Sequence, residues 1–154
     1  MGKEIERKFL VRDDRWREGA AGVVMRQGYL AVGPPVAVRV RVSGNKAMLN
    51  IKRATLELTR DEFEYAIPLA DAEAMLAGLC EGQVVEKTRY KVVFGGRMWE
   101  IDVFNGVNRG LVVAEIELAA EDDRFERPPW LGAEVSGDAR YLNSSLSRMP
   151  YTQW

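Results

Sequence analysis

The chain contains no histidine, and Cys80 is its single cysteine among 154 residues. A histidine-dependent catalytic triad and a zinc site with histidine ligands are therefore both excluded. One cysteine cannot form a disulfide within the chain, so we expect a reducing compartment and a cytoplasmic location. Any bound metal would need oxygen ligands, which favours hard cations such as Mg²⁺, Mn²⁺ or Ca²⁺.

Long hydrophobic runs and a strong net charge are also missing. No apolar run approaches about 20 residues, so we expect no membrane span, and the Met-Gly-Lys-Glu start does not resemble a secretory signal. The formal net charge is −1, so no overall field attracts nucleic acid or an acidic membrane. The length and the 47% content of hydrophobic residues predict one compact domain over residues 1–154.

What the chain has in abundance is alternation of apolar and polar residues, which predicts strands. The predicted strands are residues 3–11, 24–32, 36–42, 47–53, 60–68, 84–94, 97–104 and 111–118. Residues 69–80 change to helical spacing, with Gly82 expected to close that helix, and residues 138–147 predict a second, short helix. The predicted fold class is mainly β (α+β), an eight-stranded antiparallel closed β-barrel with a few flanking helices.

The first predicted strand carries charged residues at every second position. Glu4, Glu6 and Lys8 therefore project from one face, while Ile5 and the stem of Arg7 point to the other. The two carboxylates lie about 7 Å apart, at roughly 3.3 Å per residue. Like charges this close disfavour folding unless a metal ion or cations from neighbouring strands neutralise them.

Charged pairs at this spacing recur on other predicted strands. The acidic pairs are Glu4/Glu6, Glu62/Glu64, Glu100/Asp102 and Glu115/Glu117; the basic pairs are Arg39/Arg41 and Lys87/Arg89; Lys8 and Lys52 are single cations. Ordinary amphipathic strands facing water would explain any one pair. The recurrence and the sorting by sign within each strand favour placement inside the barrel, because a solvated surface mixes signs.

A barrel interior of this kind predicts a chemistry. Unpaired buried carboxylates are too costly to leave dry, so the interior must hold water, metal ions and a counter-ligand. Paired carboxylates suit Mg²⁺ or Mn²⁺, which commonly bridge phosphates, and arginine binds phosphate oxygens in pairs. Together they indicate a polyphosphate ligand and metal-assisted attack of water on a terminal phosphorus.

The residues that carry these features resemble a known family. The matching blocks are E-I-E-R-K-F-L-V (4–11), Q-G-Y-L (27–30), V-R-V-R (38–41), L-N-I-K (49–52), R-D-E-F-E-Y (60–65), E-K-T-R-Y (86–90), W-E-I-D-V-F (99–104), A-E-I-E-L (114–118), W-L-G-x-E-V (130–135) and R-Y-x-N (140–143). The first block contains the ExExK signature, and the ordered set resembles the CYTH superfamily, the triphosphate tunnel metalloenzymes. Asn50 and Arg53 depart from the family pattern without removing a charge.

The resemblance implies roles for individual residues. Triphosphate would be bound by Lys8, Arg39, Arg41, Lys52, Arg60, Lys87, Arg89 and Arg140. Metal would be held, directly or through water, by Glu4, Glu6, Glu62, Glu64, Asp102, Glu115 and Glu117. The candidate catalytic residues are Lys8, Lys52 and Tyr29; the last could orient a lysine or a water, or could simply be a core aromatic. The general base and the number of metals stay open.

The implied activity is hydrolysis of inorganic triphosphate, because the short chain, with its E-I-E-R-K-F-L-V start and W-L-G-x-E-V end, looks most like the bacterial inorganic tripolyphosphatase group. The alternatives are a class IV-type adenylyl cyclase, a thiamine or nucleoside triphosphatase, and a polyphosphate- or nucleotide-binding module without turnover. The four acidic pairs argue against the binding module, since phosphate binding alone would not need them. Apolar outer strand faces that exceed what two or three helices can cover make a homodimer an expectation too.

Overall fold

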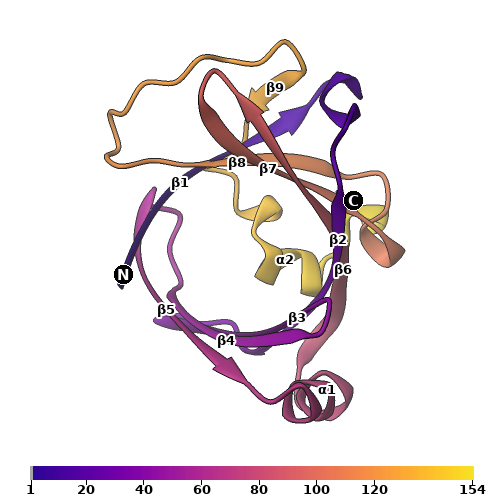
Figure 1. The fold of residues 1–154 in the computed structure, drawn as a ribbon. Helices are drawn as coiled ribbons and strands as arrows, with labels where there is room; N and C mark the ends of the chain where they lie inside the picture. The colour runs from indigo at the N-terminus through magenta and orange to yellow at the C-terminus, as the bar shows by residue number, and fades with distance from the viewer. Residues whose placement is uncertain (1) are drawn as a thin grey trace.

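The computed structural model describes residues 2–154, so Met1, the first residue of the predicted domain, lies outside the described part. Within it the chain forms a ring of strands (Figure 1). The strands are β1 (Gly2–Val11), β2 (Gly22–Ala31), β3 (Val36–Ser43), β4 (Lys46–Arg53), β5 (Thr59–Ile67), β6 (Glu81–Phe94), β7 (Arg97–Phe104), β8 (Val112–Glu117) and β9 (Leu131–Glu134). The helices are α1 (Leu69–Gly78) and α2 (Asn143–Arg148), accompanied by four single 3₁₀ turns.

The sheet closes on itself through β1. The hydrogen-bonded order is β5-β4-β3-β2-β6-β7-β8-β1, and β1 pairs back with β5, all antiparallel. One edge of β1 is shared, because Gly2 to Ile5 pair with β5 whereas Phe9 and Val11 pair with β9. The predicted eight-stranded antiparallel barrel is therefore confirmed, and β9 is an addition at its seam.

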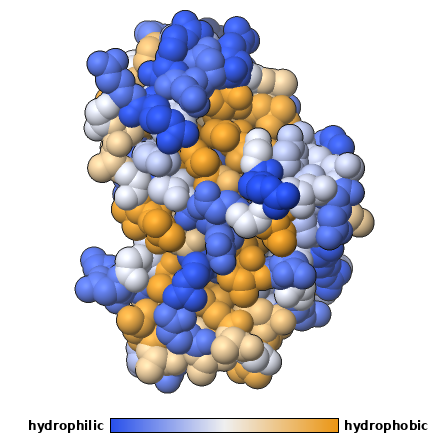
Figure 2. All heavy atoms as spheres, turned by 90° about the vertical axis from the view of Figure 1, so that its right-hand side faces the viewer, coloured by the Kyte–Doolittle hydropathy of each residue, from blue (hydrophilic) through white to orange (hydrophobic). Residues whose placement is uncertain are grey.

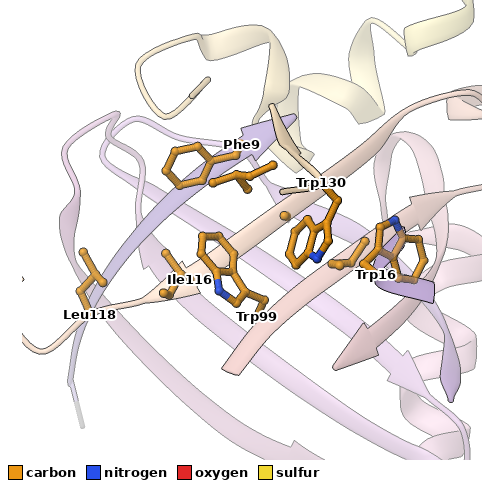
Figure 3. Close-up of a cluster of buried hydrophobic side chains, with 9 residues drawn as sticks. Phe9, Trp16, Trp99, Ile116, Leu118 and Trp130 are labelled. Atoms are coloured by element: carbon orange, nitrogen blue, oxygen red, sulfur yellow. The ribbon is translucent and has the colours of Figure 1, made fainter. Parts of the chain in front are cut away.

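The alternation along each strand sorts side chains between the inside and the outside of the barrel. On β1, Phe9 points outward and Lys8 inward, and the same division holds on β7 for Trp99 and Glu100. The outward apolar side chains of β1, β7 and β8 pack under the segment that follows β8 (Figure 3). Trp99 is the centre of this core, with ring centroids 5.8 Å from Phe9 and 5.7 Å from Trp130.

Helix α1 covers a different part of the outer wall. Its Ala72 and Leu76 pack on Val40, Val42 and Ala47 of β3 and β4. The helix ends at Gly78, so the prediction that Gly82 closes it was wrong. Strand β6 begins at Glu81, and Gly82 lies within it.

Glycine is required at position 82 because α2 approaches the backbone closely there. The φ of Gly82, +70°, lies in the left-handed region that favours glycine, and a Cβ there would lie 2.5 Å from the Ser147 carbonyl oxygen. Helix α2 sits inside the ring of strands (Figure 1). Its Leu146 is fully buried against Val85, Phe104 and Val113, so the helix closes one end of the barrel with apolar contacts.

The outer surface over β2, β6 and α1 shows hydrophobic side chains running between charged ones (Figure 2). Val24 of β2 and Leu79 after α1 are among the exposed apolar residues, as are Phe63 and Tyr65 of β5. The homodimer stays a prediction from these faces. Across residues 2–154, no helix combines the length and the apolar character that crossing a membrane would need.

Candidate active site

The barrel encloses a cavity of about 690 Å³ that is lined mainly by charged side chains. Seven strands and helix α2 contribute them: Glu4, Glu6 and Lys8 from β1; Arg39 and Arg41 from β3; Lys52 and Arg53 from β4; Arg60, Glu62 and Glu64 from β5; Lys87, Arg89 and Lys91 from β6; Glu100 from β7; Glu115 and Glu117 from β8; Arg148 from α2. Tyr29 of β2 also lines the cavity and is nearly buried. The structure thus brings together all the predicted site residues except Asp102 and Arg140.

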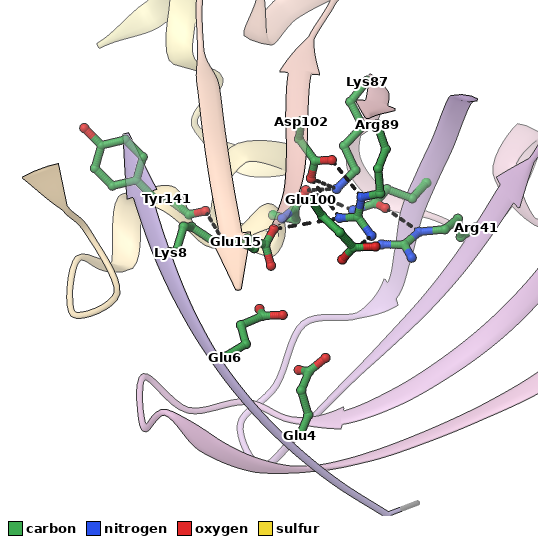
Figure 4. Close-up of polar contacts among 12 residues, drawn as sticks. Glu4, Glu6, Lys8, Arg41, Lys87, Arg89, Glu100, Asp102, Glu115 and Tyr141 are labelled. Atoms are coloured by element: carbon green, nitrogen blue, oxygen red, sulfur yellow. Dashed lines mark hydrogen bonds and ion pairs between the residues drawn. The ribbon is translucent and has the colours of Figure 1, made fainter. Parts of the chain in front are cut away.

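The cations of β3 and β6 form one side of the cavity, which we call the basic wall: Arg39, Arg41, Lys87 and Arg89. Asp102 lies behind it, fully buried, and accepts hydrogen bonds from Lys87 Nζ at 2.8 Å and Arg89 Nε at 2.8 Å (Figure 4). Burial alone would raise the pKa of Asp102, but these two cations lower it to about 2. Asp102 therefore stays ionised and holds both cations in place.

Arg39 and Arg41 carry positive charge that their surroundings do not neutralise. Within residues 2–154 neither guanidinium has an ion pair, and the buried Arg39 Nε has no hydrogen-bond partner. Burial first, and then the charges of Arg39 and Arg89, lower the pKa of Arg41 to about 9. Clustered, desolvated cations with free donors fit an anionic ligand, and their planar groups match phosphate oxygens.

The carboxylates of β1, β5 and β8 form the opposite side, the acidic wall: Glu4, Glu6, Glu62, Glu115 and Glu117. Burial, then the charge of Glu115, raises the pKa of Glu6 well above its usual value. Burial, then Glu4 and Glu62, raises the pKa of Glu117. Such crowding of oxygen ligands is the chemistry that a hard divalent cation satisfies, so the donor set fits Mg²⁺ or Mn²⁺.

Two cations partly neutralise the acidic wall. Arg60 bridges Glu4 and Glu6 at 3.2 and 3.1 Å, and Lys52 bridges Glu4 and Glu62 at 3.2 and 2.9 Å. With these cations between them, no three carboxylates of the described residues converge on a single point. Direct ligation of a metal by several of them would therefore require Arg60 or Lys52 to move aside.

Lys8 and Glu64 lie at the margins of the two walls. Lys8 Nζ donates to the Tyr141 carbonyl oxygen at 2.9 Å (Figure 4), and its charge lowers the pKa of Glu115 against the effect of burial. Glu64 is more exposed and accepts a hydrogen bond from Asn50 Nδ2 at 2.6 Å. Asn50, which departs from the family pattern, thus places an amide donor beside a predicted metal ligand.

Two predicted residues lie outside the cavity lining. Asp102 is withdrawn behind the basic wall, and both of its oxygens are used by Lys87 and Arg89. Arg140 is exposed, bonded to Asp138 at 2.8 Å and packed on the Trp154 ring at 4.8 Å. Arg140 lies in a 3₁₀ turn (Ala139–Tyr141), which has no strand alternation to set the direction of its side chain, so the sequence pattern could not place it.

Sequence reasoning gave no role to Gln27 or Asn143, which both belong to the site. Gln27 is fully buried on the inner face of β2, and Asn143, at the start of α2, lines the cavity. Both fall within blocks that resemble the family pattern. The sequence did contain one sign that Gln27 belongs to the site, because it is a polar residue on the same strand face as Met25 and Tyr29.

Comparison with known proteins agrees with this geometry. The CYTH domain profile matches residues 2–150. The chain belongs to the CYTH family. It is 50% identical over 151 residues to an inorganic triphosphatase of Acetivibrio thermocellus, covering 98% of this chain and 97% of that one. It is 39% identical over 149 residues to an inorganic triphosphatase of Nitrosomonas europaea, covering 94% and 96% of the two chains.

Solved structures show the same fold. The crystal structure of an inorganic triphosphatase superposes with a TM-score of 0.69 at 38% identity, covering 96% of this CYTH chain and 95% of that one. A protein of Pyrococcus horikoshii OT3 superposes with a TM-score of 0.59 at 19% identity, covering 77% and 81%. The second likeness bears on the fold alone.

Proposed function

We propose that this CYTH-family protein hydrolyses inorganic triphosphate to pyrophosphate and phosphate inside the barrel. The observation that carries the proposal is the division of the cavity into a basic wall with unneutralised arginines and an acidic wall with crowded carboxylates. A triphosphate with a divalent cation supplies the missing charge to both. The two relatives named inorganic triphosphatase, at 50% and 39% identity, support the same substrate.

The basic wall would bind the phosphate chain. Arg39 and Arg41 offer free guanidinium donors, whereas Lys87 and Arg89 are held by Asp102 and present a fixed charge. Fixed donors stabilise charge in the transition state without reorganising during the reaction. Arg60 belongs to this set only if it leaves Glu4 and Glu6, and Arg140 has no place in it because it lies outside the cavity lining.

The acidic wall would hold Mg²⁺ or Mn²⁺, with Glu4, Glu6, Glu62, Glu115 and Glu117 as the candidate ligands. Bound there, a divalent cation supplies neutralisation of phosphate charge and activation of water. Glu64 lies at the edge of this set. Asp102 acts instead through Lys87 and Arg89, which it orients.

Lys8, Lys52 and Tyr29 lie where substrate oxygens would meet the two walls. Lys52 pairs with Glu4 and Glu62, and Lys8 donates to the Tyr141 carbonyl oxygen, so both amino groups have partners that orient them. We assign both lysines to orientation of the terminal phosphate; Tyr29 lines the same cavity from β2. Among residues 2–154, Tyr29 is the only aromatic residue that lines the cavity, and it is nearly buried. The lining therefore offers no exposed ring on which a nucleobase could stack.

The deciding experiment is a substrate panel: inorganic triphosphate, pyrophosphate, ATP and thiamine triphosphate, each with Mg²⁺, Mn²⁺, Ca²⁺ or a chelator. We expect phosphate and pyrophosphate from inorganic triphosphate, and no release with the chelator. Cyclic AMP from ATP would replace the proposal with a cyclase. Preference for ATP or thiamine triphosphate would change the substrate, and binding without products would indicate a binding module.

A further inference from the structure

A chain of hydrogen bonds joins two cations of the basic wall through two neutral side chains. Arg41 Nε donates to Gln27 Oε1 at 2.9 Å, and Gln27 Nε2 donates to Asn143 Oδ1 at 3.0 Å. Lys87 Nζ donates to the same Asn143 oxygen at 3.2 Å. The chain therefore runs from β3 through β2 and the start of α2 to β6.

The direction of each bond in this chain is set by its two ends. Arginine and lysine can only donate, so Arg41 requires an oxygen from Gln27, and Lys87 requires an oxygen from Asn143. The Gln27 amide nitrogen is then left facing the Asn143 oxygen, which accepts it. The arrangement is consistent at both ends, so neither amide can turn over without placing donors against donors.

The chain is buried, and its amides carry no charge. Gln27 is fully buried, where an unsatisfied amide would be strongly unfavourable and an apolar side chain would be easier to accommodate. Asp102 offers a contrast, because it orients Lys87 and Arg89 and also neutralises part of their charge. A neutral amide can orient Arg41 and leave its full charge for a ligand.

We propose that Gln27 and Asn143 are positioning residues that hold Arg41 and Lys87 in the geometry that binds triphosphate. Gln27 fixes the Arg41 Nε, so that its terminal amino groups stay directed at the cavity against repulsion from Arg39 and Arg89. Asn143 gives Lys87 a second acceptor besides Asp102 and links the basic wall to α2. The inference rests on the proposed function only in that triphosphate is the anion bound.

The first test is the affinity for inorganic triphosphate, measured by calorimetry with a chelator and again with Mg²⁺. Gln27→Met keeps the side-chain length and removes both hydrogen bonds, and we expect it to weaken binding about tenfold. Gln83→Met makes the same chemical change at an exposed position of β6, and we expect binding within about twofold of wild type. Gln27→Glu should also weaken binding, because its charge would neutralise Arg41.

A double-mutant cycle separates positioning from general damage. If Gln27 acts through Arg41, most of the effect of Gln27→Met on triphosphate affinity disappears in the Arg41→Met background. Asn143→Ala provides a second variant if Gln27→Met fails to fold, with Asn105→Ala in the loop after β7 as its control. We expect Asn143→Ala to raise KM by about tenfold with a smaller change in kcat.

Two outcomes would overturn the inference. One is folded Gln27→Met and Asn143→Ala variants that bind triphosphate as wild type does, and the other is a Gln27→Met effect that is unchanged without Arg41. The proposed function is judged separately, since binding needs no turnover. A wild-type protein that binds triphosphate without hydrolysing it contradicts the function alone, and one that binds none contradicts both.

Discussion

The two walls of the cavity differ in how completely the protein neutralises them. The acidic wall on β8, β1 and β5 has internal counter-ions, with Lys52 and Arg60 each bridging two carboxylates. The basic wall on β3 and β6 has its counter-ions at Lys87 and Arg89, chiefly the buried Asp102 and, 3.8 Å from Arg89, Glu115, and it leaves Arg39 and Arg41 without an ion pair among the described residues. Under the proposed function, a metal ion entering the acidic wall would displace Lys52 or Arg60, whereas an anion could bind the basic wall directly.

This difference would separate the two proposed functions of the cavity, phosphate binding and metal binding. Charge that is already oriented by Asp102, Gln27 and Asn143 can bind a phosphate chain without rearrangement. Carboxylates held by Lys52 and Arg60 remain compatible with folding before any metal arrives. Substitutions in each wall should consequently affect different measured quantities.

The largest effect should come from the acidic wall. Glu6→Gln removes a carboxylate from the proposed metal ligands, and we expect kcat for triphosphate hydrolysis with Mg²⁺ to fall about a thousandfold with the fold intact. Phosphate release measures it, and triphosphate affinity in a chelator should not weaken. Glu73→Gln on the exposed face of α1 is the matched control. Normal turnover by Glu6→Gln would remove Glu6 from the metal site.

The buried counter-ion of the basic wall should have the next largest effect, on stability. Asp102→Ala leaves Lys87 buried with no carboxylate, so we expect the free energy of unfolding to fall by about 3 kcal/mol. Urea unfolding followed by tryptophan fluorescence measures it. Asp61→Ala, which removes an exposed partner of Lys3 and Arg53, should change it far less. If both variants lost the same free energy of unfolding, the burial of Asp102 would not make its ion pairs more important for stability than those of Asp61.

A smaller effect is expected for a free cation of the basic wall. Arg39→Ala removes a proposed phosphate donor that has no internal ion pair, so KM for triphosphate should rise about tenfold while kcat changes less. Steady-state kinetics with Arg12→Ala, an exposed arginine after β1, as the control would measure it. Unaltered KM and kcat would contradict phosphate binding by Arg39.

The smallest effect is expected outside the barrel, where Arg7 on β1 pairs with Glu134 of β9 at 2.9 Å. The hydrogen bond from Arg7 lowers the pKa of Glu134 below 4.5. The pair therefore stabilises the fold above that pH, and its contribution is lost as the pH falls through the lowered pKa. Glu134→Gln should lower the free energy of unfolding by less than about 1 kcal/mol at pH 7. Parallel urea unfolding at pH 7 and in acid checks it; a loss that persists in acid would contradict the pairing.

The strands and the faces of their charged residues were predictable because alternation is a local property. A period of two places Glu4, Glu6 and Lys8 on one face whatever the rest of the chain does. The recurrence of sign-sorted pairs predicted the barrel interior, and the closed eight-stranded barrel and the family are confirmed. Boundaries were less accurate, as the helix end at Gly78 shows.

Strand β9 escaped prediction for a physical reason. Its four residues, Leu-Gly-Ala-Glu, are too few to show alternation, and the strand exists because the edge of β1 beyond β5 is open to it. The same holds for the role of Gly82, which depends on the approach of α2 from the far end of the chain.

The sequence by itself therefore determined the fold class, the charged interior and the residue types that suit phosphate and metal. Tertiary structure alone decided the pairings within that interior: Asp102 behind the basic wall, Lys52 and Arg60 within the acidic wall, and Arg140 outside the cavity lining. Gln27 and Asn143 are 116 positions apart and meet only because the barrel closes around α2. Such contacts depend on register and closure, which no local pattern of residues encodes.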